Sequence, residues 1–355
     1  MKPLRIIGLM SGTSLDGLDI VCVDFATNKG ILTHQVIATS TVNYTNDFKL
    51  KLQQAIHLSG LELSLLSNEF ATLSAHYVTT FIQEYNLTNV NYVSSHGHTI
   101  FHQPQHKLTL QIGNGALIAA ITGINCVCDF RTGDVAHGGQ GAPLVPIGDK
   151  LLFNNYDACL NIGGFANVSY LLNNTSIAYD IAPANIVLNY LAQQIHLPYD
   201  ANGAIAKAHT PNANLLAQLN SLPYYTSTPP KSLGIEWVNE TILPLLYHYT
   251  NYEVLIATLT EHTAMQIAQS INNQLHINTV LTTGGGAFNS YLIQRIQAHS
   301  VRANYIITTA ETIGFKEAII FALLGYLRVN NMPNALASVT GASYDTCTGA
   351  IYLAR

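Results

Sequence analysis

The alternation of apolar and polar positions near the N-terminus predicts three β-strands. Apolar runs rich in Ile and Val cover residues 4–9 and 18–25, and a polar turn with Gly12 and Gly17 separates them. A third apolar run covers residues 32–42. Strand, turn and strand in this order predict a hairpin, and the three runs together predict the antiparallel start of a mixed sheet.

The pattern then changes to the helical period. Residues 46–86 place apolar side chains three and four positions apart in two successive stretches, which predicts helical structure. Short apolar runs at 92–95, 108–112 and 125–130 predict further strands, and residues 115–123 predict a short helix. Helices that alternate with strands indicate an α/β protein.

The second half of the chain repeats the N-terminal pattern. A strand, a turn with Gly163 and Gly164, and another strand fill residues 158–172. A further strand at 176–179 places Asp180 at its end, ahead of an apolar helix. A carboxylate at such a junction is a candidate catalytic acid or base, and a helix N-cap is the alternative.

A third glycine-containing element follows a long helical pattern at 252–275. The strand at 279–283 runs into three consecutive glycines, and a helix begins near Ser290. Glycines between a strand and a helix allow a flat nucleobase or ribose to lie against the backbone. A last strand at 304–307 precedes a helix that contains Glu317.

Composition narrows the class of protein. The chain has 355 residues, enough for two domains, and only 10% of them are charged, with a net charge of −5. Clustered Lys and Arg are absent, so a broad nucleic-acid-binding face is not expected. No apolar run approaches a membrane span and no signal-peptide pattern opens the chain, so we expect a cytoplasmic protein. Five cysteines, mostly in apolar runs, indicate buried reduced thiols.

The first turn carries candidate phosphate-binding chemistry. Its small residues let a phosphate approach the backbone amides, and Thr13 and Ser14 offer hydroxyl donors. Asp16 and Asp19 would suit a phosphate that carries Mg²⁺. The segment is not a P-loop, because it lacks Gly-Lys-Ser/Thr and a strand follows it. An ordinary polar hairpin turn is the alternative.

Two further segments contain candidate binding residues. Four histidines between His96 and His106 follow a predicted strand, and we expect them in a polar loop. They suggest a zinc site, but no carboxylate or thiol completes a ligand set, and hydrogen bonding is the commoner use of such histidines. The glycine-rich segment 129–144 contains Arg131, which can hold a carboxylate or phosphate bidentately, although a solvated linker is the alternative.

The ordered set of two glycine hairpins and a strand–glycine–helix element resembles the actin/hexokinase/Hsp70 fold. The resemblance implies an α/β protein of two ribonuclease H-like domains with a nucleotide cleft between them. The first domain is expected at residues 1–130 and the second at 131–339, and the segment 340–355 can pack back onto the first. In this fold the hairpins hold the phosphates of ATP, and the third element holds its adenosine.

Within this fold the sequence resembles the anhydro-N-acetylmuramic acid kinases of bacterial peptidoglycan recycling. The longest matching string runs from Gly8 to Asp19 and includes Met-Ser-Gly-Thr-Ser-Leu-Asp-Gly. Other matches follow in the family's order, and they are Ser95–Gly97, Asp129–Arg131, Asp134–Val135, Gly138–Pro146, Asn161–Gly164, Lys231–Ser232 with Gly234, and Ser338–Ala342.

The resemblance implies a homodimeric enzyme that uses ATP and Mg²⁺. Family members open the 1,6-anhydro ring of 1,6-anhydro-N-acetylmuramic acid with water and phosphorylate O6, which gives N-acetylmuramic acid 6-phosphate. Asp180 matches the carboxylate that activates the water, and Mg²⁺ carried by ATP would lie near Asp16 or Asp19. The residues expected to bind ATP are Gly12, Thr13, Ser14, Leu15, Asp16, Gly17, Leu18, Asp19, Gly163, Gly164, Gly284, Gly285 and Gly286.

The candidate sugar contacts are a separate set. Arg131 is the candidate for the lactyl carboxylate, and His96 and Thr99 are candidates for other sugar contacts. Glu317 is a candidate for a sugar hydroxyl, and a carboxylate on a helix surface is the alternative.

The sequence departs from the family at two places. Residues 180–185 read Asp-Ile-Ala-Pro-Ala-Asn where the family usually reads Asp-Thr-Gly-Pro-Gly-Asn, so Ala182 and Ala184 add methyl groups, and altered kinetics are expected. His98 stands where Gln is common.

Three alternative functions stay open: another sugar or small-carboxylate kinase of this fold, an ATP-binding switch without catalysis, and a degenerate homologue.

Overall fold

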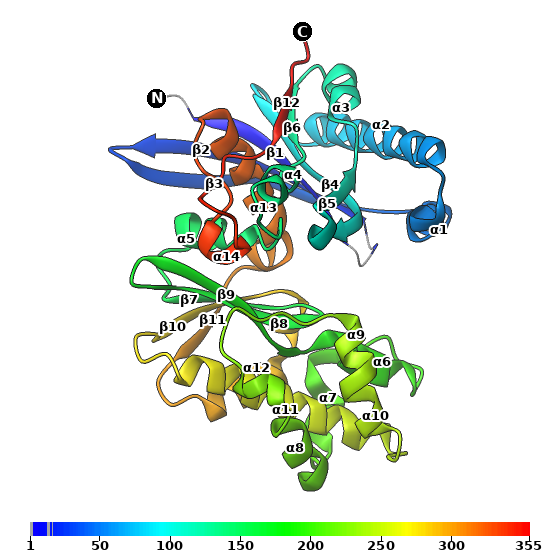
Figure 1. Ribbon diagram of the computed structural model, residues 1–355, viewed down its shortest axis with the longest axis vertical. Helices are drawn as coiled ribbons and strands as arrows, with labels where there is room; N and C mark the ends of the chain where they lie inside the picture. The colour runs from blue at the N-terminus through cyan, green and yellow to red at the C-terminus, as the bar shows by residue number, and fades with distance from the viewer. Residues whose placement is uncertain (1–2, 13–14, 16) are drawn as a thin grey trace. The chain divides into compact units, whose positions relative to one another are not determined.

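The computed structural model describes residues 3–12, 15 and 17–355. The chain forms two compact units (Figure 1). The first unit contains Met1–Leu152 and Phe315–Arg355, and the second contains Phe153–Gly314.

The first unit is built on a mixed sheet with antiparallel and parallel halves. β1 pairs with β2 and β2 with β3 in antiparallel fashion, whereas β1, β4 and β6 are parallel. β5 pairs with β4 in antiparallel fashion, and β12 lies at one edge of the sheet, where it pairs antiparallel with β6. The strands are β1 (Leu4–Ser11), β2 (Gly17–Asn28), β3 (Ile31–Asn43), β4 (Tyr92–Gln103), β5 (Leu108–Ile112), β6 (Asn125–Cys128) and β12 (Ala350–Tyr352).

Helices cover both faces of this sheet, because the strand period of two sends alternate side chains of β1 to opposite sides. Ile7 packs in a core with Phe70 of α2. Gly8 faces α13, where a Cβ would lie 2.3 Å from the carbonyl oxygen of Ala318, so only glycine allows this approach. The helices of this unit are α1 (Asn46–Gln54), α2 (Gly60–Glu84), α3 (Gly115–Thr122), α4 (Thr132–Ala136), α5 (Val145–Leu152), α13 (Ala310–Val329, from Phe315 onward) and α14 (Ala337–Thr340).

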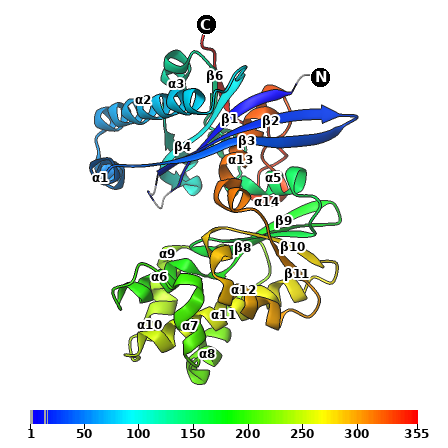
Figure 2. The ribbon, with the colours of Figure 1, turned by 180° about the vertical axis from the view of Figure 1, so that it is seen from behind.

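The second unit has a five-stranded sheet and a group of helices that lie together on one side of it (Figure 2). Its strands are β7 (Ala158–Ile162), β8 (Phe165–Leu172), β9 (Thr175–Pro183), β10 (Thr279–Thr283) and β11 (Asn304–Ile307). Its helices are α6 (Asn185–Gln193), α7 (Ala204–Ala208), α8 (Ala213–Asn220), α9 (Ile235–Trp237), α10 (Leu243–Leu246), α11 (Tyr252–Asn272) and α12 (Ser290–His299). One core joins the sheet to α11 and α12, and a second joins α6, α8 and α11.

The two units repeat one topology. In each sheet three strands form an antiparallel meander. The first strand of the meander pairs, on its other side, with a strand parallel to it, and a further parallel strand follows. The strand orders are β3-β2-β1-β4-β6 and β9-β8-β7-β10-β11. This is the ribonuclease H-like arrangement, so the predicted α/β fold class is confirmed. The predicted strands at 108–112, 279–283 and 304–307 are confirmed residue for residue.

The structure differs from the sequence-based expectations in three places. The units divide at 152/153 and 314/315 rather than at 130/131 and 339/340, because α5 and most of α13 pack on the first sheet. β4 continues to Gln103, so His96 and His98 lie in a strand and not in the expected loop. Asp180 lies within β9 rather than at its end, because pairing with β8 continues to Pro183.

Four of the cysteines are buried free thiols, as expected, whereas Cys347 is a free thiol that is exposed. Within the described part of the chain, none of the helices combines the length and apolar character needed to cross a membrane.

Candidate active site

The cationic cluster of the first unit consists of Arg131, which follows β6, and His96, which lies within β4. Arg131 Nε donates to His96 Nε2 at 3.1 Å, and Arg131 Nη2 lies 3.0 Å from the same nitrogen. Arg131 Nη1 donates to the carbonyl oxygen of Gly141 at 2.7 Å. A guanidinium has five N–H donors, and these bonds use three of them, so the group keeps two donors for an anion.

Asp134 holds the glycine-rich segment that Arg131 contacts. It is fully buried, and its Oδ2 accepts from the backbone N–H of Gly141 at 2.8 Å. Its Oδ1 accepts from the hydroxyl of Thr340 at 2.8 Å, which ties the segment to α14. Asp134 therefore fixes the Gly141 carbonyl, and through it the guanidinium of Arg131.

The ionisation of this cluster follows from burial. Desolvation, then the charge of Arg131, lowers the pKa of His96 well below its usual value. His96 is therefore neutral, and because its Nε2 accepts from Arg131, its proton is on Nδ1. Desolvation also lowers the pKa of Arg131 to about 10, so the guanidinium stays charged at neutral pH.

Glu317 and Asp19 belong electrostatically to the same region of the first unit. Burial raises the pKa of Glu317, the charges of Arg131 and Lys316 oppose this, and the charge of Asp19 adds to it. Other groups surround the carboxylate of Glu317, although the residue keeps solvent-accessible surface. Asp19 Oδ1 accepts from the hydroxyl of Thr41 at 2.6 Å. Glu317 thus lies close enough to Arg131 for their charges to interact.

Thr99 lies two strand positions beyond Gly97 on β4 and is half-buried. Its Oγ1 accepts from the amide of Gln111 at 3.3 Å across the β4–β5 pair. The structure therefore brings His96 and Arg131 into direct contact but gives Thr99 a partner on β5.

His98 is a buried structural group in this chain. Ser11 Oγ lies 2.9 Å from His98 Nδ1 and accepts from the hydroxyl of Tyr44 at 2.8 Å. Burial lowers the pKa of His98 to about 4, so the ring is neutral and its Nδ1 shares a hydrogen bond with the Ser11 hydroxyl. This relay fixes the last residue of β1 immediately before the first glycine turn.

The first glycine turn is described in part. The backbone N–H of Leu15 donates to the Gly12 carbonyl at 3.2 Å, and the Leu15 and Leu18 side chains pack against the core of the first unit. A Cβ at Gly17 would lie 2.4 Å from the Val42 carbonyl oxygen, so strand packing alone requires that glycine. Three candidates of this turn, Thr13, Ser14 and Asp16, lie outside the described residues.

The second glycine hairpin is attached to the start of α6. The Gly164 carbonyl accepts from the N–H groups of Ala184 and Ile186, and the Gly163 carbonyl accepts from that of Asn185. A Cβ at either glycine would make only ordinary contacts, the nearest at 3.5 Å. Space therefore exists for a group to lie against this backbone.

The three glycines after β10 differ in what requires them. A Cβ at Gly284 would lie 2.6 Å from Asn161 Oδ1, and one at Gly286 would lie 2.2 Å from Ile162 Cγ2. These two glycines allow the turn to pack on β7. A Cβ at Gly285 would meet nothing closer than 3.8 Å, so Gly285 is the member with space for a ligand.

Asp180 lies at an irregularity in β9. Asn167 pairs with Asp180 but its neighbour Ala166 pairs with Ala182, so Ile181 is the extra residue of a β-bulge. Asp180 Oδ2 accepts from the backbone N–H of Leu233 at 2.9 Å. Burial raises the pKa of Asp180, and the Leu233 bond opposes that rise. A half-buried carboxylate with one oxygen held and a raised pKa is suited to general-base catalysis.

Sequence reasoning missed the residues that surround these groups. Residues 221–232 show neither a helical nor a strand period in the sequence, yet this stretch supplies Tyr224 and Lys231 to the neighbourhood of Asp180. The Lys231–Ser232 match was the available signal. A second omission is the buried ion pair of Lys316 and Asp149, 2.7 Å apart, which joins α13 to α5 within the first unit.

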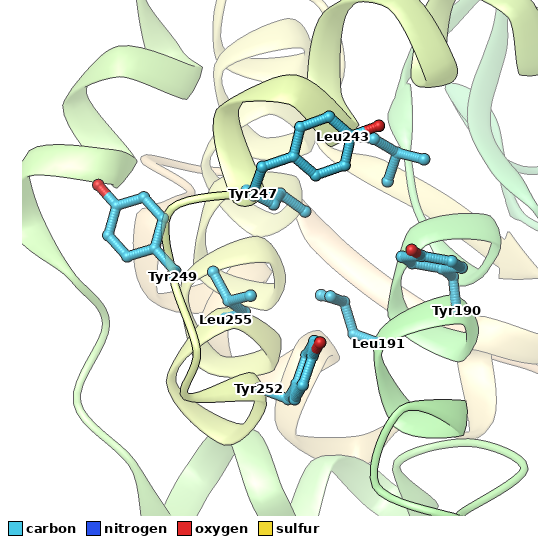
Figure 3. A pocket seen from close by; sticks show the side chains of 8 residues that line it. Tyr190, Leu191, Leu243, Tyr247, Tyr249, Tyr252 and Leu255 are labelled. Carbon is cyan, nitrogen blue, oxygen red and sulfur yellow. The ribbon is translucent and has the colours of Figure 1, made fainter.

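Other candidate sites lack suitable chemistry. No group of three His, Cys, Asp or Glu side chains in the described ranges is arranged to hold a metal ion. A small cavity of about 110 Å³ in the second unit is lined by tyrosines and leucines alone (Figure 3). Its lining offers no carboxylate or imidazole for proton transfer; it comprises Tyr190, Leu191, Leu243, Leu246, Tyr247, Tyr249, Tyr252 and Leu255.

The duplicated ribonuclease H-like unit and the paired glycine hairpins define a protein of the actin/hexokinase/Hsp70 class. The profile of the anhydro-N-acetylmuramic acid kinase family matches residues 4–354. The chain belongs to the anhydro-N-acetylmuramic acid kinase family, as its resemblance predicted, and is therefore a sugar kinase.

The sequences of individual family members match this chain over nearly their full length. The anhydro-N-acetylmuramic acid kinase of Haemophilus influenzae is 36% identical over 99% of this chain and 98% of its own. That of Bacillus cereus is 33% identical over 98% of both chains. Among solved structures, the activator of the 2-hydroxyisocaproyl-CoA dehydratase from Clostridium difficile with bound ADPNP is 13% identical, with a TM-score of 0.43 over 89% of this chain and 96% of its own. A sequence identity and a TM-score this low assign no activity to the chain.

Proposed function

We propose that the protein phosphorylates 1,6-anhydro-N-acetylmuramic acid with ATP and that Asp180 is the general base. The supporting observation is the environment of Asp180: one carboxylate oxygen is held by the Leu233 N–H, and burial raises the pKa. Family membership supports the substrate and the use of ATP. The product would be N-acetylmuramic acid 6-phosphate, consistent with a role in peptidoglycan recycling.

The proposed reaction couples ring opening to phosphoryl transfer. Asp180 removes a proton from water as the water oxygen bonds to C1 and the C1–O6 bond breaks. The released O6 attacks the γ-phosphorus of ATP, and ADP leaves. One base therefore serves both events, and the sum is anhydro-sugar, water and ATP to sugar 6-phosphate, ADP and a proton.

The proposed nucleotide contacts fit the glycines that have free space beside them. Gly163, Gly164 and Gly285 leave room for phosphates or ribose against the backbone of the second unit. Gly284 and Gly286 would support that surface through packing. In the first unit, the turn from Gly12 to Asp19 is the proposed phosphate-binding element.

Mg²⁺ bound with ATP would neutralise charge on the phosphates. Asp19 lies in β2 directly after the first turn, and a carboxylate would suit an ion whose other ligands are phosphate oxygens and water. Asp16 is the second proposed ligand.

The sugar contacts are proposed from the cationic cluster of the first unit. Arg131 keeps two N–H donors and a positive charge, which suits the lactyl carboxylate. His96 orients the guanidinium and carries its own proton on Nδ1, so we assign it a positioning role beside direct sugar contact. Glu317 and Thr99 remain the proposed acceptors for sugar hydroxyls.

Mass spectrometry in ¹⁸O-labelled water tests the proposal directly. Purified protein, ATP, Mg²⁺ and 1,6-anhydro-N-acetylmuramic acid should give a phosphorylated sugar with one heavy oxygen at C1. A phosphorylated product without the label would indicate another kinase reaction, in which Asp180 deprotonates a substrate hydroxyl. Nucleotide binding without any product would contradict the proposal. The proposal also includes a cytoplasmic homodimer, which sedimentation equilibrium of the purified chain and fractionation of the producing cells would check.

A further inference from the structure

Residues 224–233 contact Asp180 at three points. The hydroxyl of Tyr224 donates to the Asp180 carbonyl at 2.7 Å. The N–H of Asp180 donates to the Lys231 carbonyl at 3.3 Å, and the N–H of Leu233 donates to Asp180 Oδ2 at 2.9 Å. One segment thus binds the carbonyl, the amide and the carboxylate of a single residue, and we call residues 224–233 the clamp.

The side chain of Lys231 contacts Tyr224, so the two ends of the clamp are connected. Its Nζ donates to the Tyr224 carbonyl at 3.0 Å and lies 4.6 Å from the centroid of the Tyr224 ring. The same ammonium lies 5.7 Å from the ring of Tyr179, which precedes Asp180 in β9. Within the described ranges Lys231 forms no ion pair with a carboxylate. Its ammonium interacts instead with a carbonyl oxygen and with two aromatic rings.

Aromatic packing ties the clamp to the helices of the second unit. Tyr224 packs on Trp237, with ring centroids 5.4 Å apart. Tyr225 donates its hydroxyl to the buried His262 of α11, with 2.8 Å between Oη and Nε2. The clamp is therefore held independently of any ligand.

We propose that Tyr224 and Lys231 are positioning residues for Asp180. They hold the Leu233 N–H against Oδ2, so that Oδ1 is the oxygen left to accept the proton of the reacting water. The inference rests on the proposed role of Asp180 as the base and adds the residues that orient it.

Loss of the clamp has a specific consequence for the pH dependence. The Leu233 bond stabilises the ionised carboxylate and opposes the rise in the pKa of Asp180 that burial causes. Without this bond the pKa of Asp180 rises further, and a larger fraction of the base is protonated at low pH. The acid limb of the kcat/KM profile should therefore move to higher pH, whereas a purely structural defect would lower activity without moving it.

Two variants and their matched controls test the proposal. Lys231→Met keeps the aliphatic chain and removes the ammonium, and Tyr224→Phe keeps the ring and removes the hydroxyl. Each should lower kcat by about tenfold to a hundredfold, the factor expected for a hydrogen bond to a charged group, and should raise the acid-limb pKa, with KM for ATP unchanged. Lys231→Arg, which keeps the charge, should recover part of kcat. The exposed residues Lys207 and Tyr247 supply the controls Lys207→Met and Tyr247→Phe, which should match the wild type.

The outcomes separate this inference from the proposed function. If Asp180→Asn keeps wild-type turnover, the proposed base is wrong. If Asp180→Asn loses turnover while Lys231→Met and Tyr224→Phe keep the wild-type kcat and acid limb, the clamp has no positioning role. If Lys231→Met fails to fold, Tyr224→Phe decides by the same two readouts.

Discussion

The two units share a strand order but place their functional groups on different strands. In the first unit the cationic cluster comes from the parallel half of the sheet, where His96 lies on β4 and Arg131 follows β6. In the second unit the candidate base lies on β9, the outer strand of the antiparallel half. The first cluster is cationic, whereas the second centres on a carboxylate. The two units thus keep one strand order, whereas the cationic cluster and Asp180 occupy different positions in it.

The largest expected effect comes from removing the negative charge of Asp180 in the second unit. Asp180→Asn is nearly isosteric and keeps an acceptor for the Leu233 N–H, but it cannot take a proton from water. General-base catalysis contributes about 10² to 10⁴ in rate, so turnover should fall by that factor. Stopped-assay measurement of kcat, with nucleotide affinity from calorimetry, checks this prediction.

Nucleotide affinity serves as the control in that experiment. Among the described residues no hydrogen bond joins Asp180 to Gly163, Gly164 or Gly285, so Asp180→Asn should bind ATP as the wild type does. Turnover within twofold of the wild type would remove Asp180 from the mechanism.

The sequence predicted the strands better than the polar contacts. The glycine hairpins and the strand at 279–283 follow from local patterns of apolar and glycine residues, and they were predicted. The bond between Arg131 and His96 joins residues 35 positions apart through parallel pairing of β4 and β6, which no local pattern reports. The Leu233 N–H on Asp180 comes from a segment without periodicity, so it could not be predicted at all.

The glycines after β10 are expected to affect stability rather than turnover. Gly286→Ala would place a Cβ 2.2 Å from Ile162 Cγ2 in the core of the second unit, which we expect to cost about 1 to 3 kcal/mol as overpacking. Gly285→Ala meets open space and should leave stability nearly unchanged while weakening ATP binding. Trp237 is the single tryptophan of the chain and lies in the second unit, so its fluorescence reports denaturant unfolding there.

Equal unfolding midpoints for these two variants would contradict the packing argument. Normal ATP affinity in Gly285→Ala would instead contradict the proposed contact of this glycine with the nucleotide.

The cationic cluster of the first unit can be tested by removing its charge. Arg131→Met keeps much of the buried side-chain volume and loses the donors to an anion. A charge-assisted hydrogen bond contributes about 1.5 to 3 kcal/mol, so KM for the sugar should rise by about tenfold to a hundredfold. Arg131→Lys should give an intermediate value, because an ammonium keeps the charge but not the planar pair of donors. Steady-state kinetics with sugar varied at saturating ATP measure both, and an unchanged KM for the sugar would exclude this role of Arg131.

The smallest expected effect concerns the two alanines that distinguish this chain from the usual family pattern. Ala182 and Ala184 are buried at 0% and 1% exposure, and their methyl groups belong to the core that joins the sheet of the second unit to α11 and α12. Ala182→Gly loses about 0.8 kcal/mol for a buried methyl and about 0.5 to 1 kcal/mol of backbone entropy, a total of about 1 to 2 kcal/mol. Ala178→Gly in the same strand is the matched control, because Ala178 is only half-buried and the entropy cost alone applies. Trp237 fluorescence should therefore show a larger loss for Ala182→Gly than for Ala178→Gly, and equal losses would mean that the methyl at 182 does not stabilise the strand that carries Asp180.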